Sequence, residues 1–332
     1  MASKIQVLIL LFSPFLLLSH LSSSQACPIV TYWGQNRDEG ELDAACNTGK
    51  YDIINIAFMN TFGNGQTPNI DLSGHCSASW GVPCTKYASQ IATCQSLGVK
   101  IFLSLGGGWG PYNLSSAEEA KQVADHLWTN YLSGQTGSAS LLGDVVLDGI
   151  DFDIENGTDL YWDVLLKELS AYSQQKKLYL SAAPQCPIPD YYLNTAISTG
   201  LFDYIWVQFY NNRQCEYTDD GDTQKLIDSW NQWTTDFTAT KFYVGLPASP
   251  EANGSAGGYV PIDVLNNEIL PVVETNPKFG GVMLWSRYYD NKTRYSDQIA
   301  CTTPGAFNVA RAPLVAMMKS ASEVLYRLLP QF

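Results

Sequence analysis

The sequence predicts an α/β fold in which eight parallel strands close into a single-domain (β/α)8 TIM barrel. Short runs rich in apolar, β-branched and aromatic residues alternate with longer stretches that have the three-to-four spacing of amphipathic helices. The alternation extends over residues 29–301. Polar residues and glycines directly follow several of the expected strands, at the end where a barrel of this kind carries its active site.

The strands are expected at the apolar runs 29–32, 53–58, 100–104, 149–153, 178–182, 204–209, 242–245 and 281–284. Helices are expected at 117–132, 160–174, 223–233 and 262–273, with a short eighth helix at about 295–300. An open, doubly wound sheet is the alternative fold. It would need a glycine-rich phosphate-binding turn after the first strand, and the residues there are Trp33-Gly34-Gln35-Asn36.

The stretch 148–155, Asp-Gly-Ile-Asp-Phe-Asp-Ile-Glu, alternates acidic and apolar residues with a period of two. As a strand it places Asp151, Asp153 and Glu155 on one face and apolar side chains on the other. Carboxylates crowded in an apolar site raise one another's pKa, so one of the three should stay protonated near neutral pH. A protonated carboxyl group is what a general acid requires.

Two other interpretations of this stretch fit less well. A solvated acidic face on a surface strand disagrees with the apolar neighbours at 145–147, which are typical of a buried parallel strand. A calcium-binding EF-hand loop needs glycine at its sixth position and a bidentate carboxylate at its twelfth. This chain has Asn156 and Trp162 at those positions.

Residues 148–155 resemble the D-G-x-D-x-D-x-E signature of family 18 glycoside hydrolases, and Ser104-Leu105-Gly106-Gly107 resembles the second motif of that family. Further segments resemble the plant class III chitinases of the hevamine type. They are Tyr-Trp-Gly-Gln-Asn at 32–36, Asn-Ile-Ala-Phe at 55–58, Trp-Val-Gln-Phe-Tyr-Asn-Asn at 206–212 and Gly-Val-Met-Leu-Trp-Ser at 281–286. The resemblance extends over about residues 29–300.

The resemblance implies a secreted endochitinase that hydrolyses β-1,4-linked N-acetylglucosamine polymers with retention, together with some lysozyme-like activity. It implies that Glu155 is the general acid and that Asp153 orients the acetamido group of the substrate, which acts as nucleophile in place of a second carboxylate. Asp151 would share a proton with Asp153, and Tyr210 would hold the acetamido oxygen. The expected substrate-binding residues are Gln208, Trp285, Tyr32, Phe58, Gly107 and Trp109. No cofactor and no metal site are expected.

Residues 1–26 have the pattern of a secretory signal peptide. Lys4 precedes an apolar run at 5–18 that is too short for a transmembrane span, and small residues end the segment at Ala26. Lys4 is the only charge in this segment, so its removal takes the net charge from −13 to −14. An acidic chain is unsuited to nucleic acid and compatible with chitin or its oligosaccharides. We expect a monomer without membrane attachment, located outside the cell or in the vacuole.

Eight cysteines in a chain expected to be secreted indicate disulfides. The resemblance implies the pairs Cys46–Cys94, Cys76–Cys84 and Cys186–Cys215, which leaves Cys27 and Cys301. Cys27 opens the first strand and Cys301 follows the expected eighth helix, so both should lie at the barrel face opposite the active site. We therefore predict a Cys27–Cys301 disulfide across the seam between the first and eighth units.

Three expectations remain open. The catalytic barrel should comprise residues 27–301, and residues 302–332 should form a C-terminal helical extension, which could be a docked helix or a removable sorting tail. The alternative function is a non-enzymatic storage or carbohydrate-binding barrel. Two acidic clusters could add weak calcium buffering to either function; they are Asp38, Glu39, Glu41 and Asp43, and Glu216, Asp219, Asp220 and Asp222.

Overall fold

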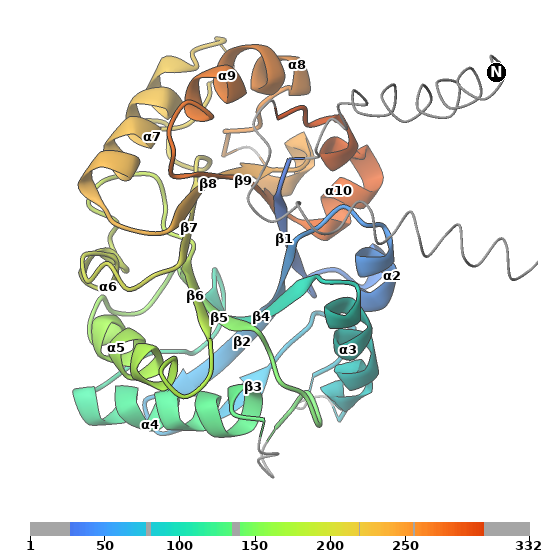
Figure 1. The fold of residues 1–332 in the computed structure, drawn as a ribbon, viewed down its shortest axis with the longest axis vertical. Helices are drawn as coiled ribbons and strands as arrows, with labels where there is room; N and C mark the ends of the chain where they lie inside the picture. Colours follow the sequence, from blue (N-terminus) through green and yellow to red (C-terminus); the bar gives the residue numbers. More distant parts are fainter. Residues whose placement is uncertain (1–26, 78–80, 135–139, 219, 255, 302–332) are drawn as a thin grey trace, which may run out of the picture.

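A computed structural model describes residues 27–77, 81–134, 140–218, 220–254 and 256–301 (Figure 1). The expected signal peptide and the expected C-terminal extension lie outside these residues. Within the described ranges, eight parallel strands close into a barrel: β1 (Ile29–Trp33), β2 (Ile53–Gly63), β4 (Lys100–Gly107), β5 (Gly149–Ile154), β6 (Tyr179–Ala182), β7 (Tyr204–Gln208), β8 (Lys241–Pro247) and β9 (Phe279–Trp285).

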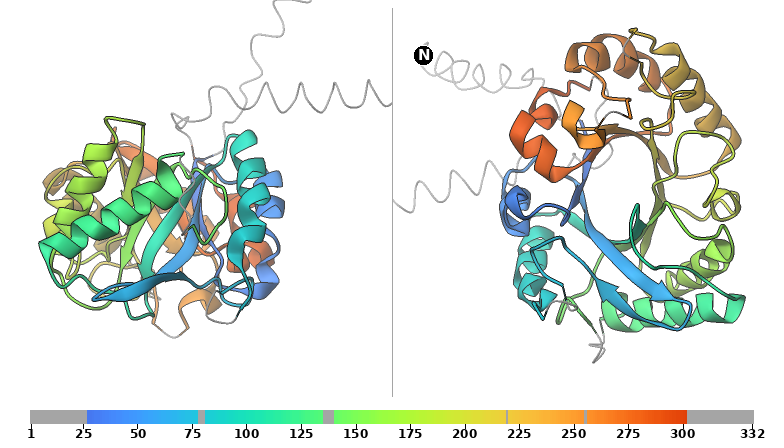
Figure 2. Two further views of the ribbon diagram at one scale, coloured as in Figure 1. Left: turned by 90° about the horizontal axis from the view of Figure 1, so that it is seen from below. Right: turned by 180° about the vertical axis from the view of Figure 1, so that it is seen from behind.

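Closure of the barrel is visible at β1, which pairs in parallel with both β2 and β9. Thr31 faces Ile54 on one side and Leu284 on the other. The helices lie around the outside of the strands (Figures 1 and 2). The predicted (β/α)8 barrel is therefore confirmed, and the open-sheet alternative is wrong.

A short strand that the sequence analysis did not predict is β3 (Gln66–Ile70). It pairs antiparallel with the end of β2, which runs five residues past the predicted end at 58. The sequence of β3, Gln-Thr-Pro-Asn-Ile, has weak strand propensity by itself. The hairpin partner supplies the pairing that makes it a strand.

The helices are α2 (Leu42–Asn47), α3 (Ala88–Ser96), α4 (Ala117–Leu127), α5 (Trp162–Tyr172), α6 (Asn194–Ile197), α7 (Gln224–Asp236), α8 (Ile262–Val264), α9 (Leu270–Val273) and α10 (Arg287–Thr293). Two of the predicted helices contain a π-helical turn. One is η4 (Trp128–Leu132), which follows α4, and the other is η6 (Leu265–Ile269), which separates α8 from α9. No helix in the described ranges is long and apolar enough to cross a membrane.

The expectation of an eighth helix at about 295–300 was wrong. The helix is α10, and residues Tyr295–Gln298 form only a 3-10 turn after it. The buried carboxylate of Asp290 explains the position of this turn. It accepts hydrogen bonds from the backbone nitrogen and the hydroxyl of Ser296 (2.7 and 2.6 Å) and another from the hydroxyl of Tyr51. The chain therefore folds back directly after α10.

Four disulfides are present, and they are the pairs expected from the sequence: Cys27–Cys301, Cys46–Cys94, Cys76–Cys84 and Cys186–Cys215. The Cα atoms of Cys27 and Cys301 are 4.9 Å apart. This bridge joins the start of β1 to the segment that follows α10, so it closes the seam of the barrel even though the last helix lies earlier than expected.

The interior of the barrel is filled by side chains, many of them aromatic. The ring of Phe102 lies 6.4 Å from that of Tyr204, and the ring of Trp206 lies 5.8 Å from that of Tyr243. A second core packs the outer faces of the strands against the helices. Because side chains fill the interior, a substrate can bind only at one of the two end faces of the barrel. The polar groups gather at the face formed by the carboxyl ends of the strands.

Candidate active site

Asp151 lies at the bottom of the candidate site and is fully buried. Its Oδ2 accepts hydrogen bonds from the hydroxyls of Ser104 (2.7 Å) and Tyr32 (2.9 Å), and its Oδ1 accepts one from the hydroxyl of Ser181 (2.8 Å). The two serines face Asp151 from β4 and β6, in register with it. Burial raises the pKa of Asp151 to about 6, and the hydroxyl donors oppose this rise.

Asp153 stands two residues further along β5 and is 3% exposed. Burial, followed by the negative charges of Glu155 and Asp151, raises its pKa well above the usual value. Asp153 also hydrogen-bonds to Glu155. The two carboxyl groups can therefore hold one proton between them, as the crowded acidic strand predicts.

The amide of Gln208, at the end of β7, joins these two carboxyl groups. Its Nε2 lies 3.0 Å from Oδ1 of Asp153, 3.2 Å from Oε1 of Glu155 and 2.9 Å from the carbonyl oxygen of Ala183. An amide nitrogen has two hydrogens, so it serves two of these three acceptors at once. We expected Gln208 to contact the substrate, and the structure places its nearly buried side chain against the catalytic candidates.

Glu155 follows β5 directly and is half-buried, so its carboxyl group can reach a substrate. Its backbone nitrogen and that of Asn156 both donate to the hydroxyl of Tyr112 (2.9 and 3.1 Å). The same hydroxyl donates to the carbonyl oxygen of Gly107 (2.6 Å). Burial raises the pKa of Tyr112, which keeps this hydroxyl protonated. Tyr112 therefore ties the end of β5 to the end of β4.

The glycine turn after β4 leaves room for its neighbours. Gly107 has φ +85°, and a Cβ atom there would lie 2.8 Å from the ring of Phe58. A Cβ atom on Gly108 would lie 3.2 Å from Oε2 of Glu155. Only glycine fits at Gly107 without displacing a neighbour, whereas a side chain at Gly108 would press against the flexible carboxyl end of Glu155.

Three aromatic residues expected to bind substrate lie together on β1, β2 and the end of β9. The ring of Tyr32 lies 5.9 Å from Phe58 and 5.6 Å from Trp285, and the rings of Phe58 and Trp285 are stacked at 6.1 Å. Tyr32 and Phe58 are buried, whereas Trp285 is half-buried. Trp285 is therefore the member of this group that offers a ring surface to a ligand.

Tyr210 lies two residues beyond β7 and is 6% exposed. Burial and then the negative charges of Glu155 and Asp153 raise its pKa, so its phenol stays protonated. Gly258 packs against it, because a Cβ atom there would lie 2.5 Å from the Cα of Tyr210. The structure thus brings Tyr210, Glu155 and Asp153 together, with a phenol available as a hydrogen-bond donor.

Trp109 is separate from the aromatic group around Trp285. Its side chain is 87% exposed, on the loop that follows β4. Sequence reasoning also missed four residues that position the catalytic candidates: Ser104, Ser181, Trp206 and Tyr112. Ser104 and Ser181 could have been found by aligning the expected strands beside β5. Tyr112 lies in a loop and has no such pattern.

The two acidic clusters do not form a preformed metal site. In the part of the chain that the structure describes, no group of three or more histidine, cysteine or acidic side chains is placed to hold a metal ion. Glu39 is turned inward, where its Oε1 accepts from the backbone nitrogens of Gly34 (2.8 Å) and Asn36 (3.0 Å). Glu216 is also buried and accepts from the backbone nitrogen of Asn212 (2.7 Å). Asp219 lies outside the described residues.

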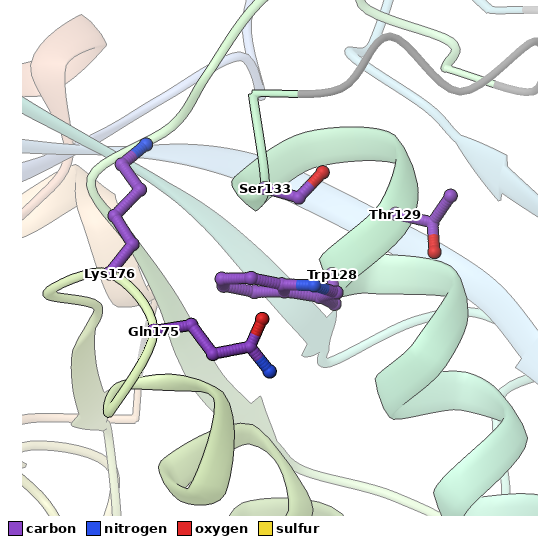
Figure 3. A pocket seen from close by; sticks show the side chains of 5 residues that line it. All are labelled: Trp128, Thr129, Ser133, Gln175 and Lys176. Carbon is purple, nitrogen blue, oxygen red and sulfur yellow. The ribbon is translucent and has the colours of Figure 1, made fainter.

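A cavity of about 230 Å³ lies away from this site, between η4 and the turn that leads into β6 (Figure 3). It is lined by Trp128, Thr129, Ser133, Gln175 and Lys176. Because β6 starts there, the cavity lies at the amino end of the strands, whereas Glu155 follows the carboxyl end of β5. None of the catalytic candidates lines it.

Comparison with known proteins identifies the family. The model of the glycosyl hydrolases family 18 matches residues 28–258. This chain belongs to glycosyl hydrolases family 18. An acidic endochitinase from Vitis vinifera is 54% identical to this chain over 287 residues. The match covers 85% of this chain and 93% of the endochitinase.

Solved structures share the same barrel. The ICChI chitinase from Ipomoea carnea is 47% identical to this chain, with a TM-score of 0.77. The match covers 82% of this chain and 98% of the chitinase. A xylanase-alpha-amylase inhibitor protein, XAIP-I, is 42% identical, with a TM-score of 0.77 over 82% of this chain and 97% of that chain. Chains of similar fold thus include a protein named as a chitinase and a protein named as an inhibitor.

Proposed function

We propose that this chain, an endochitinase of family 18, cleaves β-1,4 links between N-acetylglucosamine units with retention, using the acetamido group of the substrate as nucleophile. The observation that carries the proposal is the pair formed by Asp153 and Glu155, which is hydrogen-bonded, bridged by Gln208 and set above the buried Asp151. Such a pair can hold a proton near neutral pH and deliver it to a leaving group.

In the first step Glu155 donates its proton to the glycosidic oxygen, and the C1–O bond breaks. The acetamido carbonyl oxygen of the sugar that keeps C1 attacks that carbon and forms an oxazolinium ion. Asp153 accepts a hydrogen bond from the acetamido N–H and stabilises the positive ring. In the second step a water molecule gives a proton to Glu155 and attacks C1. This attack opens the oxazolinium ring and restores the starting configuration at C1.

The neighbours of the pair support these roles. The pKa of Tyr210 is raised, so its phenol is available as a donor to the acetamido oxygen, which would orient that oxygen for attack. The half-buried ring of Trp285 can pack against the apolar face of a sugar unit. Asp151 contributes a negative charge that raises the pKa of Asp153. Proton sharing between Asp151 and Asp153 stays a prediction.

Substitution of Glu155 by Gln tests the proposal. It removes the acid and keeps the size of the side chain, so kcat on a chitin hexamer should fall by a factor of about 100 to 10,000. The thermal midpoint should stay near that of the wild type, because the backbone nitrogen that bonds Tyr112 is unchanged. The product released by the wild type should first be the β-anomer. Unchanged turnover in the variant would sink the proposal.

Carbohydrate binding without turnover is the second candidate function. Its motivation is the similarity to a protein named as a xylanase-alpha-amylase inhibitor. The hydrogen-bonded pair of Asp153 and Glu155 favours the enzyme, because a binding protein does not need a carboxyl group that holds a proton. Complete absence of hydrolysis of a chitin hexamer by the wild-type chain, together with binding of the same hexamer, would favour the second candidate.

Secretion of a monomeric chain completes the proposal. Four disulfides are typical of an oxidising compartment, which fits an extracellular or vacuolar location. The N-terminal sequence of protein recovered from a secreting host should begin at Cys27, and light scattering should give the mass of one chain. Lysozyme-like activity should be measurable as clearing of a peptidoglycan suspension. Each of these outcomes can fail without affecting the others.

A further inference from the structure

Four stretches of the chain have the pattern Asn-x-Ser/Thr, which is the acceptor sequence for N-linked glycosylation. They begin at Asn113, Asn156, Asn253 and Asn291. A chain that enters the secretory pathway can be modified at such a sequence, and the attached oligosaccharide is bulky and hydrophilic. The folded protein therefore tolerates a glycan only where the amide nitrogen of the Asn side chain opens into solvent.

The acceptor sequences at Asn113 and Asn156 interlock beside the candidate active site. The side-chain oxygen of Asn113 accepts from the hydroxyl and from the backbone nitrogen of Thr158, the third residue of the Asn156 sequence (2.9 and 3.3 Å). A Cβ atom on Gly157 would lie 3.3 Å from the same oxygen. Both asparagines are half-buried, and Asn156 directly follows Glu155. A glycan on either one would force apart the loops after β4 and β5.

The amide nitrogen of Asn253, to which a sugar would be attached, lies against the backbone of its own loop. It donates a hydrogen bond to the carbonyl oxygen of Gly257. Asn253 is half-buried and ends the 3-10 turn η5 (Pro250–Asn253) after β8. The same loop packs on Tyr210, since a Cβ atom on Gly258 would lie 2.5 Å from the Cα of Tyr210. A sugar on Asn253 would displace this loop.

Asn291 has a different environment. It lies on α10, on the outside of the barrel, and its side chain is exposed (Figure 1). The inward side of α10 carries the buried residues Arg287 and Asp290. In the part of the chain that the structure describes, the side-chain amide of Asn291 has no hydrogen-bond partner. A glycan at this position therefore displaces no loop and breaks no hydrogen bond.

The hydroxyl of Thr293, the third residue of the Asn291 sequence, sets the order of events. In the folded protein it donates to the carbonyl oxygens of Ala248 (2.8 Å), directly after β8, and of Tyr289 (3.1 Å). The acceptor pattern is defined by a hydroxyl at this position, so the transferring enzyme must meet that hydroxyl before it is engaged. The sugar is therefore attached before α10 packs against the end of β8.

We propose that Asn291 carries an N-linked oligosaccharide and that Asn113, Asn156 and Asn253 do not. The donor is an oligosaccharide that ends in N-acetylglucosamine and is linked through C1 to a polyisoprenoid diphosphate. Nδ2 of Asn291 forms a bond to C1, the bond from C1 to the diphosphate breaks, the lipid diphosphate leaves, and one amide proton passes to water. The proposal rests on the proposed secretion and is independent of the proposed catalysis.

The test is a glycopeptide map of residues 27–332 secreted by a eukaryotic host behind a leader sequence of that host, so that delivery does not depend on residues 1–26. The protein is treated with an enzyme that leaves one N-acetylglucosamine on each modified Asn, and peptide masses then identify the sites. We expect sugar on the Asn291 peptide and none on the other three. Asn291→Gln should lose the whole glycan mass, whereas the matched control Asn113→Gln and the conservative variant Thr293→Ser should keep it.

A bare Asn291 peptide in the secreted wild type would overturn the proposal, as would equal masses of the wild type and Asn291→Gln. Sugar on Asn156 in protein that hydrolyses a chitin hexamer would overturn the exclusion of that site. Turnover separates this proposal from the proposed function. Asn291→Gln should keep the kcat of the wild type, because α10 carries the glycan on the outside of the barrel. An occupied Asn291 in a chain without turnover would contradict the proposed function alone.

Discussion

The hydroxyl of Tyr32 donates a hydrogen bond of 2.9 Å to Oδ2 of Asp151 inside the barrel. The same hydroxyl accepts a hydrogen bond of 3.0 Å from Nε1 of Trp206. Tyr32 was expected to bind substrate, yet it is 2% exposed and supports the lowest carboxyl group of the acidic strand. The proposed catalytic pair, Asp153 and Glu155, therefore rests on a buried polar layer, and substitutions in that layer have effects that can be measured.

The stability of the fold should depend on pH through Asp151. Burial raises its pKa from 3.8 to about 6 in the folded protein, so the folded state binds this proton more tightly than the unfolded state does. This contribution is complete below about pH 4 and is lost as the pH rises through 6. The free energy of unfolding of the wild type, relative to Asp151→Asn, should fall by up to about 3 kcal/mol between pH 4 and pH 7. Urea denaturation at both pH values checks this, and a constant difference would contradict it.

Asp151→Asn should also move the pH profile of catalysis. The negative charge of Asp151 raises the pKa of Asp153, which shares a hydrogen bond with Glu155. Without that charge the pKa of Asp153 is lower, so the alkaline limb of kcat/KM should shift toward acid pH. Initial rates on a chitin hexamer over the range from pH 4 to 9 give the profile. An alkaline shift would show that the sign is wrong.

Tyr112→Phe should slow the reaction, because it removes the hydroxyl that binds the backbone nitrogens of Glu155 and Asn156. We expect kcat to fall about tenfold as the carboxyl group loses its position. The free energy of unfolding should fall by about 1–3 kcal/mol, because buried polar groups lose their partner.

Tyr131→Phe is the matched control. Tyr131 is another buried tyrosine, and its hydroxyl accepts from the backbone nitrogen of Leu141 (3.3 Å) rather than from a residue of the acidic strand. Tyr131→Phe should lower the free energy of unfolding and leave kcat unchanged. Equal changes in kcat for Tyr112→Phe and Tyr131→Phe would show that Tyr112 has no specific role in positioning Glu155.

The disulfide Cys27–Cys301 should stabilise the fold more than Cys76–Cys84. The first joins residues 274 positions apart and the second joins residues 8 positions apart. By loop-closure entropy their removal costs about 5.5 and about 2.5 kcal/mol. Urea denaturation of the two double serine variants measures both losses. A larger loss for Cys76→Ser/Cys84→Ser would contradict the entropic explanation.

The sequence analysis predicted the barrel and the acidic strand because their signals are local. The alternation within 148–155 places Asp153 and Glu155 on one face whatever the partners of the strand are. The position of Gln208 at a strand end follows from the same periodicity. All eight barrel strands overlap their predicted runs by at least four residues, and β1 differs from its run only by its last residue, Trp33.

The remainder depends on contacts between distant parts of the chain. Tyr112 is 43 residues from Glu155, and nothing around it in the sequence indicates that its hydroxyl binds two backbone nitrogens. The burial of Tyr32 and Phe58 follows from the packing of the barrel interior, which periodicity does not describe. The eighth helix lies earlier than expected, at Arg287–Thr293, and the turn after it is fixed by the bond from Ser296 to the buried carboxylate of Asp290, which a lone Asp in the sequence does not indicate.

The central claim is that the acetamido group of the substrate is the nucleophile while Glu155 is the acid. The most direct test is the rate on aryl glycosides of chitin oligosaccharides whose acetamido group next to the scissile bond carries zero, one, two or three fluorines. Each fluorine withdraws electrons from the carbonyl oxygen, so kcat/KM should fall steeply along the series. A rate that is independent of fluorination would contradict the account, since it would mean that the acetamido oxygen does not attack C1.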